Sequence, residues 1–238
     1  MAEGQLSEEA VKESTTEKTA DQVLDMIMDY VADGTIQMGD RLNTAKLAQM
    51  MGTSRMPVRE ALSVMVQKRL AYNVRNAGMR VVEISDDEFV EIYRIRQLLE
   101  PEAAYLACKN ATPEDIANLE QLFLEHEAAV MADPVNPKVV HKCNRAFHFG
   151  IYRAAHREHL TNVIGDLWDQ LSFAKLLYGE ALLNNPKNRV ALVREHRYYL
   201  ECVKNGWAGE MRAAVYNCIE EKIRKYASHD DSQLKSYF

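Results

Sequence analysis

The sequence predicts a mainly α protein in which a winged helix-turn-helix precedes an all-α antiparallel helical bundle. Apolar residues recur at helical spacing along most of the 238 residues. Segments with the composition of strands occur only between residues 71 and 84. Residues 41–82 hold eight Lys and Arg side chains against one Glu, although the whole chain carries a net charge of −6. One segment therefore suits an anionic partner, and the acidic remainder suits a different task.

The composition, with 47% hydrophobic and 27% charged residues, is that of a globular protein long enough for two modest domains. There is no run of about 18 apolar residues to predict a transmembrane helix. The polar first residues lack the apolar core of a secretory signal, and four cysteines without CxxC spacing indicate reduced thiols. We therefore expect a cytoplasmic protein with domains at 18–84 and 85–228, a disordered tail at 1–17 and a polar tail at 229–238.

The N-terminal domain is expected to contain three helices and a two-stranded wing. Helical periodicity predicts a helix over 19–32, a short helix over 44–51 that Gly52 closes, and a third helix over 54–70. Strands are expected over 71–74 and 79–84. The turn Asn76-Ala77-Gly78 joins them, since Asn and Gly supply the required turn chemistry.

The third helix has the features of a helix that reads DNA. Ser54 or Thr53 can cap its N-terminus, and Pro57 falls in the first turn, where its missing N–H costs little. Arg55 and Arg59 are four residues apart and project from one face, from which they can reach guanine edges or phosphates. The opposite face is apolar and comprises Val58, Ala61, Leu62, Met65 and Val66.

Beyond Ser85 the sequence predicts only helices, at 86–109, 113–132, 136–155, 157–183, 187–205 and 208–228. Three acidic residues directly after Ser85 are typical of a helix start. Proline, asparagine and glycine residues mark the breaks between the later helices. Six helices with short loops predict an antiparallel bundle.

These residues resemble the GntR family of bacterial transcription regulators. The resemblance covers 18–84 and is carried by Gly34, Ile36, Gly39-Asp40-Arg41-Leu42, Leu47-Ala48, Gly52, Ser54-Arg55 and Pro57-Val58-Arg59-Glu60-Ala61-Leu62. The helical part resembles the ligand-sensing FCD domain of the FadR subfamily through Arg96-Gln97-Leu98-Leu99-Glu100-Pro101, Asn144-Arg145-Ala146-Phe147-His148 and Glu195-His196-Arg197. The resemblance implies a homodimer that binds a pseudo-palindromic operator. It also implies a repressor of a metabolic operon, the commonest arrangement in the family, whose repression is relieved by a small carboxylate or sugar acid.

The resemblance places the DNA contacts on the second and third helices and the wing. The candidate DNA-binding residues are Thr53, Ser54, Arg55, Met56, Arg59, Lys46, Asn76 and Gly78. After Leu42 the chain has Asn43-Thr44-Ala45-Lys46, where the family usually has an acidic residue. The operator sequence is therefore not predicted.

The resemblance also implies a divalent metal inside the bundle, because FCD domains of this type often hold one. The matching ligand positions are Asn144, His148, His196 and Cys218, in which Asn replaces the usual Asp and Cys replaces the last His. Asn144 and His148 share a helix face. This set suits Zn²⁺ better than manganese or nickel. Alternatively, the histidines are hydrogen-bonded core residues and Cys218 is a small buried side chain.

A carboxylate effector needs a charged partner in the bundle. Arg96 is the candidate that matches the family, and Arg145 and Tyr199 are further candidates; alternatively, Arg96 forms a salt bridge with Glu100. A zinc-dependent enzyme of all-α fold and an effector-blind DNA-binding protein with a decayed sensor site are the competing functions. The sequence has no HExxH motif, nucleophile elbow or glycine-rich phosphate loop, so we do not expect an enzyme.

Overall fold

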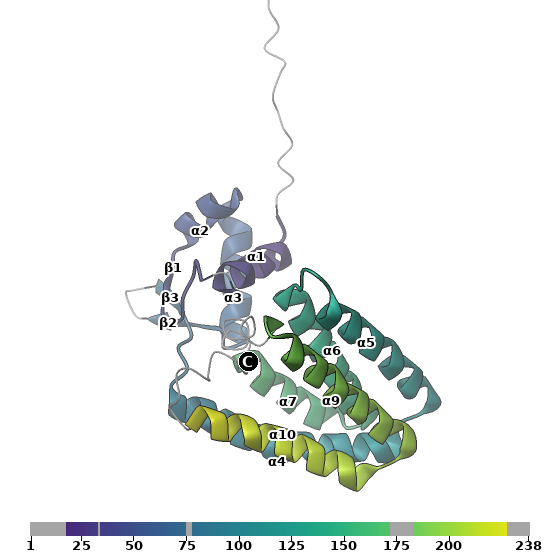
Figure 1. Ribbon diagram of the computed structural model, residues 1–238. Helices are drawn as coiled ribbons and strands as arrows, with labels where there is room; N and C mark the ends of the chain where they lie inside the picture. The colour runs from purple at the N-terminus through teal and green to yellow at the C-terminus, as the bar shows by residue number, and fades with distance from the viewer. Residues whose placement is uncertain (1–17, 33, 75–77, 172–182, 228–238) are drawn as a thin grey trace, which may run out of the picture.

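The computed structural model describes residues 18–32, 34–74, 78–171 and 183–227, and its elements confirm the predicted fold class (Figure 1). The N-terminal part contains α1 (Ala20–Ala32), β1 (Arg41–Leu42), α2 (Thr44–Met51), α3 (Arg55–Gln67), β2 (Ala71–Val74) and β3 (Gly78–Val81). The helical part contains α4 (Asp86–Asn110), α5 (Pro113–Met131), α6 (Pro137–Ala154), α7 (Glu158–Gln170), α9 (Pro186–Asn205) and α10 (Ala208–Ala227). None of these helices is long and apolar enough to cross a membrane.

The small sheet has one strand more than the sequence predicted. Its order is β1-β3-β2, all antiparallel, with Arg41 opposite Arg80 and Leu42 opposite Met79. A two-residue strand is too short to produce a readable alternation of apolar and polar residues, so β1 was missed. The strand predicted over 79–84 instead spans Gly78–Val81. The sheet and the three helices share one cluster of buried side chains that includes Val58, Leu62 and Val81.

Helix α3 ends at Gln67, earlier than the predicted residue 70. Arg69 adopts a left-handed φ of 57°. Its amide donates to the Val66 carbonyl, and the Leu70 amide donates to the Met65 carbonyl at 2.8 Å. This pair of bonds is the Schellman arrangement that closes a helix and turns the chain towards β2.

A second, larger cluster of buried side chains lies within the helical part. Helices α4 and α10 lie side by side along one edge of this part, and α5, α6, α7 and α9 cover the other side (Figure 1). The helix predicted over 157–183 is shorter: α7 ends at Gln170, where the Leu171 amide bonds to the Trp168 carbonyl in a tightened last turn. Residues 172–182 lie outside the described residues.

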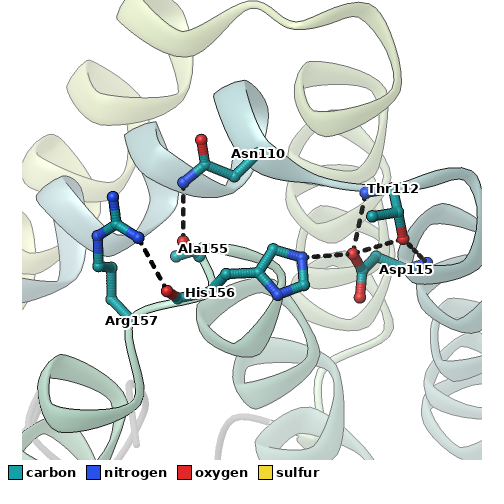
Figure 2. Close-up of polar contacts among 6 residues, drawn as sticks. All are labelled: Asn110, Thr112, Asp115, Ala155, His156 and Arg157. Atoms are coloured by element: carbon teal, nitrogen blue, oxygen red, sulfur yellow. Dashed lines mark hydrogen bonds and ion pairs between the residues drawn. The ribbon is translucent and has the colours of Figure 1, made fainter.

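Two turns of the helical part meet in a hydrogen-bonded corner (Figure 2). The Asp115 carboxylate accepts from both the amide and the hydroxyl of Thr112 at the start of α5, and it lies 2.9 Å from Nε2 of His156. His156 has a left-handed φ of 53° in the turn between α6 and α7. Asn110 donates to the Ala155 carbonyl at 2.8 Å, so the end of α4 is tied to the same turn.

Asp115→Ala is expected to lower the free energy of unfolding by about 1–2 kcal/mol at pH 7, because the capping interactions of α5 are lost. Burial alone would raise the pKa of Asp115, but the hydrogen bonds from Thr112 and His156 outweigh it and hold the pKa below its usual value of 3.8. A lowered carboxyl pKa stabilises the fold above the unfolded-state value, and this contribution is lost as pH falls through the folded value.

Urea denaturation followed by circular dichroism at pH 7 and below pH 3.8 measures this difference for Asp115→Ala. The difference from wild type should shrink at the lower pH. Glu114→Ala, at the exposed neighbouring position, is the matched control. Equal destabilisation by the two substitutions would contradict the role given to the Asp115 carboxylate.

Candidate functional site

Helix α3 has one packed face and one open face. Pro57, Val58, Ala61, Leu62 and Met65 are buried. Arg55, Met56 and Arg59 are exposed at the N-terminal end, and Met56 is 70% exposed. Helix α3 therefore has the apolar face and the arginine face that the sequence predicts for the third helix.

The other predicted DNA contacts that the structure describes lie on α2, directly before α3 and at the start of β3. Lys46 is exposed on α2, and Gly78 is exposed at the start of β3 with a φ of 81°. Ser54 occupies the N-cap position of α3 without a side-chain capping bond. The Thr53 hydroxyl is buried and has no hydrogen-bond partner among the described residues. Asn76 lies outside the described residues.

Three of the four predicted metal-site residues come together inside the bundle. Asn144 and His148 lie on α6, and His196 lies on α9. The side-chain amide of Asn144 lies 2.9 Å from Nε2 of His196, and the rings of His148 and His196 are 5.0 Å apart. His196 is fully buried, and its Nδ1 lies 2.8 Å from the Leu192 carbonyl.

The protonation of His196 decides what this cluster can bind. Burial lowers the pKa of His196 well below its usual value, and His126 lowers it further, so the ring is neutral at pH 7. A carbonyl beside Nδ1 requires the proton there, which leaves Nε2 as an acceptor. The Asn144 atom that lies 2.9 Å from Nε2 is the amide oxygen, Oδ1. Nε2 accepts a hydrogen bond from Asn144 only when the amide is turned so that its N–H faces the ring.

Cys218 does not complete a metal site in this arrangement. Its sulfur lies 3.7 Å from Oε1 of Glu195, and burial raises the pKa of the thiol. No three His, Cys, Asp or Glu side chains of the described residues converge as a metal would require. His148, His196 and Cys218 therefore do not form a group of three ligands in this arrangement, and the zinc site stays a prediction of the family resemblance.

A buried polar network surrounds Glu100 on α4. Its carboxylate accepts from Nε of Arg96 at 2.6 Å, from the indole N–H of Trp168 at 2.6 Å and from the Tyr152 hydroxyl at 2.8 Å. Arg96 is only 2% exposed and makes the ion pair with Glu100 that the sequence offered as an alternative to ligand binding. The Tyr152 hydroxyl also lies 3.5 Å from Nδ1 of His148, so this network reaches the histidine cluster.

The remaining candidates for the effector lie on either side of this network. Tyr199 on α9 is buried, and its ring centroid is 6.1 Å from that of His148. Arg145 on α6 is partly buried, and its guanidinium carbon lies 4.5 Å from the centroid of the Phe149 ring. The bundle therefore brings Arg96, Tyr199, His148 and His196 together, with Arg145 beyond Trp168.

Sequence reasoning missed one buried polar residue of the bundle core, His126. His126 is fully buried, its ring stacks on that of His196 at 4.2 Å, and burial lowers its pKa to about 4. Neither of its ring nitrogens has a hydrogen-bond partner among the described residues. Its place in the apolar series Leu119, Phe123, His126 and Val130 was the signal that could have revealed it.

Asp169, near the end of α7, connects the bundle with the end of α3. Its carboxylate lies 2.7 Å from Nη2 of Arg145 and 3.3 Å from Nζ of Lys68, the C-cap residue of α3. A second ion pair joins Lys138 of α6 to Asp29 of α1. A candidate effector residue, Arg145, and the end of α3 thus share one carboxylate.

Comparisons with known proteins agree with this two-part architecture. Residues 19–81 match the model for "Bacterial regulatory proteins, gntR family", and residues 91–221 match the FCD domain. The HTH-type transcriptional regulator McbR of Escherichia coli is 32% identical over 163 residues, which span 68% of this chain and 70% of McbR. The Uxu operon transcriptional regulator of the same organism is 28% identical over 219 residues, 84% of each chain.

Solved structures show the same fold. The E. coli McbR structure has a TM-score of 0.66 and 27% sequence identity, and the match covers 88% of this chain and 97% of that one. A GntR regulator from Rhodococcus sp. RHA1 has a TM-score of 0.67 at 15% identity, covering 88% and 98%. The matched families and relatives are transcription regulators and not enzymes, which sets aside the zinc-dependent enzyme. The chain belongs to the GntR family and is a DNA-binding transcription regulator with an FCD domain.

Proposed function

We propose that this regulator is a ligand-responsive repressor of a metabolic operon that binds a pseudo-palindromic operator as a homodimer. One α3 helix would enter the major groove of each half-site. The observation that carries the proposal is the open face of α3, where Arg55, Met56 and Arg59 are exposed at the helix N-terminus. Arginines so placed reach guanine edges or phosphates, and an exposed Met offers apolar contact to a thymine methyl group.

Selection of bound duplexes from a random DNA library tests the proposal. We expect an inverted repeat whose half-sites lie about one helical turn apart, and two chains per duplex in analytical ultracentrifugation. Operator affinity should fall steeply with salt, because Lys and Arg contacts to phosphates release counterions. Failure to enrich any sequence, or an affinity that does not change with salt, would contradict the proposal.

We place the effector, a small carboxylate or sugar acid, in the bundle near Arg96, Tyr199 and Arg145. Buried arginine and tyrosine side chains can donate charged and neutral hydrogen bonds to a carboxylate. The zinc prediction is tested separately, by elemental analysis of wild type beside Cys218→Ala. Zinc near one equivalent in wild type that is lost in the variant would support a site at Asn144, His148, His196 and Cys218.

Coupling between the bundle and DNA would pass through Asp169. A carboxylate that engages Arg145 would compete with Asp169, and Asp169 also holds Lys68 at the end of α3. A ligand shifts an equilibrium only by binding the two arrangements unequally. A carboxylate that competes with Asp169 for Arg145 would bind more tightly to the arrangement in which Arg145 is released from Asp169.

Asp169→Asn is therefore expected to weaken operator binding without ligand by up to about fivefold, since a half-exposed ion pair is worth at most about 1 kcal/mol. Lys68→Met should have the same effect, and the double variant should lose no more than either single variant. Fluorescence anisotropy on the selected operator measures all four affinities. Losses that add in the double variant would show that the two residues act independently.

A further inference from the structure

Helix α4 packs along α10 at the edge of the helical part, and one side of its surface stays open (Figure 1). Leu98, near the middle of α4, is 74% exposed, the largest exposed fraction of any large apolar side chain among the described residues. Ile95, one turn earlier, is 37% exposed, and Tyr216 on α10, whose carbonyl accepts from Gln97, is 46% exposed. Exposed apolar side chains that adjoin in this way are typical of an interaction surface.

Seven residues of α4 form one stripe centred on Leu98, and all lie within about 40° of it around the helix axis. Their separations are four, three, four, four, three and four residues, so the spacing is the same in both directions from Leu98. Six of the seven are exposed, and Tyr105 is partly buried. We call this set the α4 stripe, which comprises Asp87, Glu91, Arg94, Leu98, Glu102, Tyr105 and Lys109.

A second copy of α4 that runs antiparallel and crosses at Leu98 would meet this stripe with opposite charges. Arg94 lies four residues before Leu98 and Glu102 lies four residues after it, so the two come to the same level on facing copies. Asp87 and Lys109 lie eleven residues before and after Leu98 and match in the same way. A parallel copy would instead place like charges opposite each other, which is costly. The charges therefore favour an antiparallel arrangement with two-fold symmetry.

The polar members of the α4 stripe keep room for a partner from another chain. Arg94 and Glu102 each make an ion pair to α10 within their own chain, yet the Arg94 side chain is 49% exposed and that of Glu102 is 47% exposed. Glu91 and Tyr105, seven residues before and after Leu98, also match, because a phenol hydroxyl can donate to a carboxylate.

The same arrangement fixes how far apart the two DNA-binding domains are attached. Helix α4 begins at Asp86, twelve residues before Leu98. At a rise of about 1.5 Å per residue, the starts of two antiparallel α4 helices that cross at Leu98 lie about 36 Å apart. Half-sites one helical turn apart are separated by about 34–36 Å. An antiparallel α4 pair thus spaces the two domains on the scale of the proposed operator.

We propose that a second copy of this chain docks on the α4 stripe, with the two α4 helices antiparallel and the two-fold axis at Leu98. The inference rests on the proposed homodimer and names the surface that forms it. The two Leu98 side chains pack against each other at the centre of the contact. The ion pairs on either side fix the direction and the register of the two helices.

Reversal of charge in the α4 stripe tests this register. Arg94→Glu puts carboxylates at both positions of one ion pair, and Glu102→Arg puts guanidinium groups there. Each variant alone should dimerise about tenfold more weakly than wild type or worse, because like charges then meet twice across the two-fold axis. An equimolar mixture of the two variants restores opposite charges at both contacts, so the mixed dimer should form in preference to either homodimer. Native mass spectrometry of the full-length chains separates the three dimers by mass.

Leu98→Glu tests the centre of the contact and should raise the dimer dissociation constant by about tenfold or more, because two carboxylates would then face each other. Sedimentation equilibrium measures this constant without DNA. Leu124→Glu on α5, where the leucine is 56% exposed, is the matched control, and Arg197→Glu on α9 is the control for the charge reversals. Both controls should dimerise like wild type. Reversal is preferred to truncation because an exposed ion pair contributes little.

The possible outcomes separate this surface from the proposed function. Wild-type dissociation constants in Leu98→Glu and in both reversals would overturn the docking surface and leave the homodimer standing. A statistical mixture of dimers from the two reversed variants would overturn the antiparallel register. A wild-type chain that is monomeric without DNA would also overturn the proposal, whereas two chains on each operator duplex would still support operator binding. A chain that dimerises through the α4 stripe but enriches no DNA sequence would refute the proposed operator recognition instead.

Discussion

Glu100→Ala is expected to lower the free energy of unfolding by about 3–5 kcal/mol, the usual cost of removing one partner from a buried ion pair. The Glu100 carboxylate accepts three hydrogen bonds, from Arg96, Trp168 and Tyr152. The substitution leaves a buried guanidinium without its counter-charge and two buried donors without this acceptor. The expected 3–5 kcal/mol includes the cost of these unsatisfied donors, which is roughly 1–3 kcal/mol for each one.

Urea denaturation followed by circular dichroism measures this loss. Glu102→Ala is a suitable control, because Glu102 lies two residues further along α4 and pairs with Arg212 at the exposed surface. An exposed pair of this kind contributes at most about 1 kcal/mol. A loss as small in Glu100→Ala as in Glu102→Ala would show that the buried network contributes little to stability.

The helices could be predicted from the sequence because their signals are local. Residues 44–51 were predicted from periodicity and from Gly52, and α2 has these bounds, with Gly52 in the left-handed conformation. The capping sequence after Ser85 likewise forms a capping box with Glu88. The end of α3 was missed because Arg69, a residue that rarely takes positive φ, closes the helix.

The candidate site could be predicted only in part, because its decisive contacts join different helices. The spacing of Asn144 and His148 placed them on one face of α6. It could not show that the Asn144 amide would bond to His196 on α9. The place of Glu100 at the centre of a network depends on how α4, α6 and α7 pack. His126 was missed because a single histidine in an apolar stripe resembles a core residue.

Arg59→Ala is expected to weaken binding to the selected operator by about 1–3 kcal/mol, roughly 5- to 150-fold, if Arg59 contacts a base edge. Arg59 is exposed on α3, and the fold does not depend on its side chain, so the melting temperature should not change. Arg194→Ala, at an exposed position on α9, is the matched control. Wild-type affinity in Arg59→Ala would remove Arg59 from the interface.

The pattern of the loss separates two roles for Arg59. A base contact is made only on the selected sequence, so its removal should cost more affinity for the operator than for random DNA. A phosphate contact is made on any duplex, so its removal should weaken binding to the operator and to random DNA equally. It should also reduce the slope of log affinity against log salt concentration by about one. Because Arg59 lies one helical turn beyond Arg55 on the open face of α3, we expect the first pattern for at least one of these two arginines.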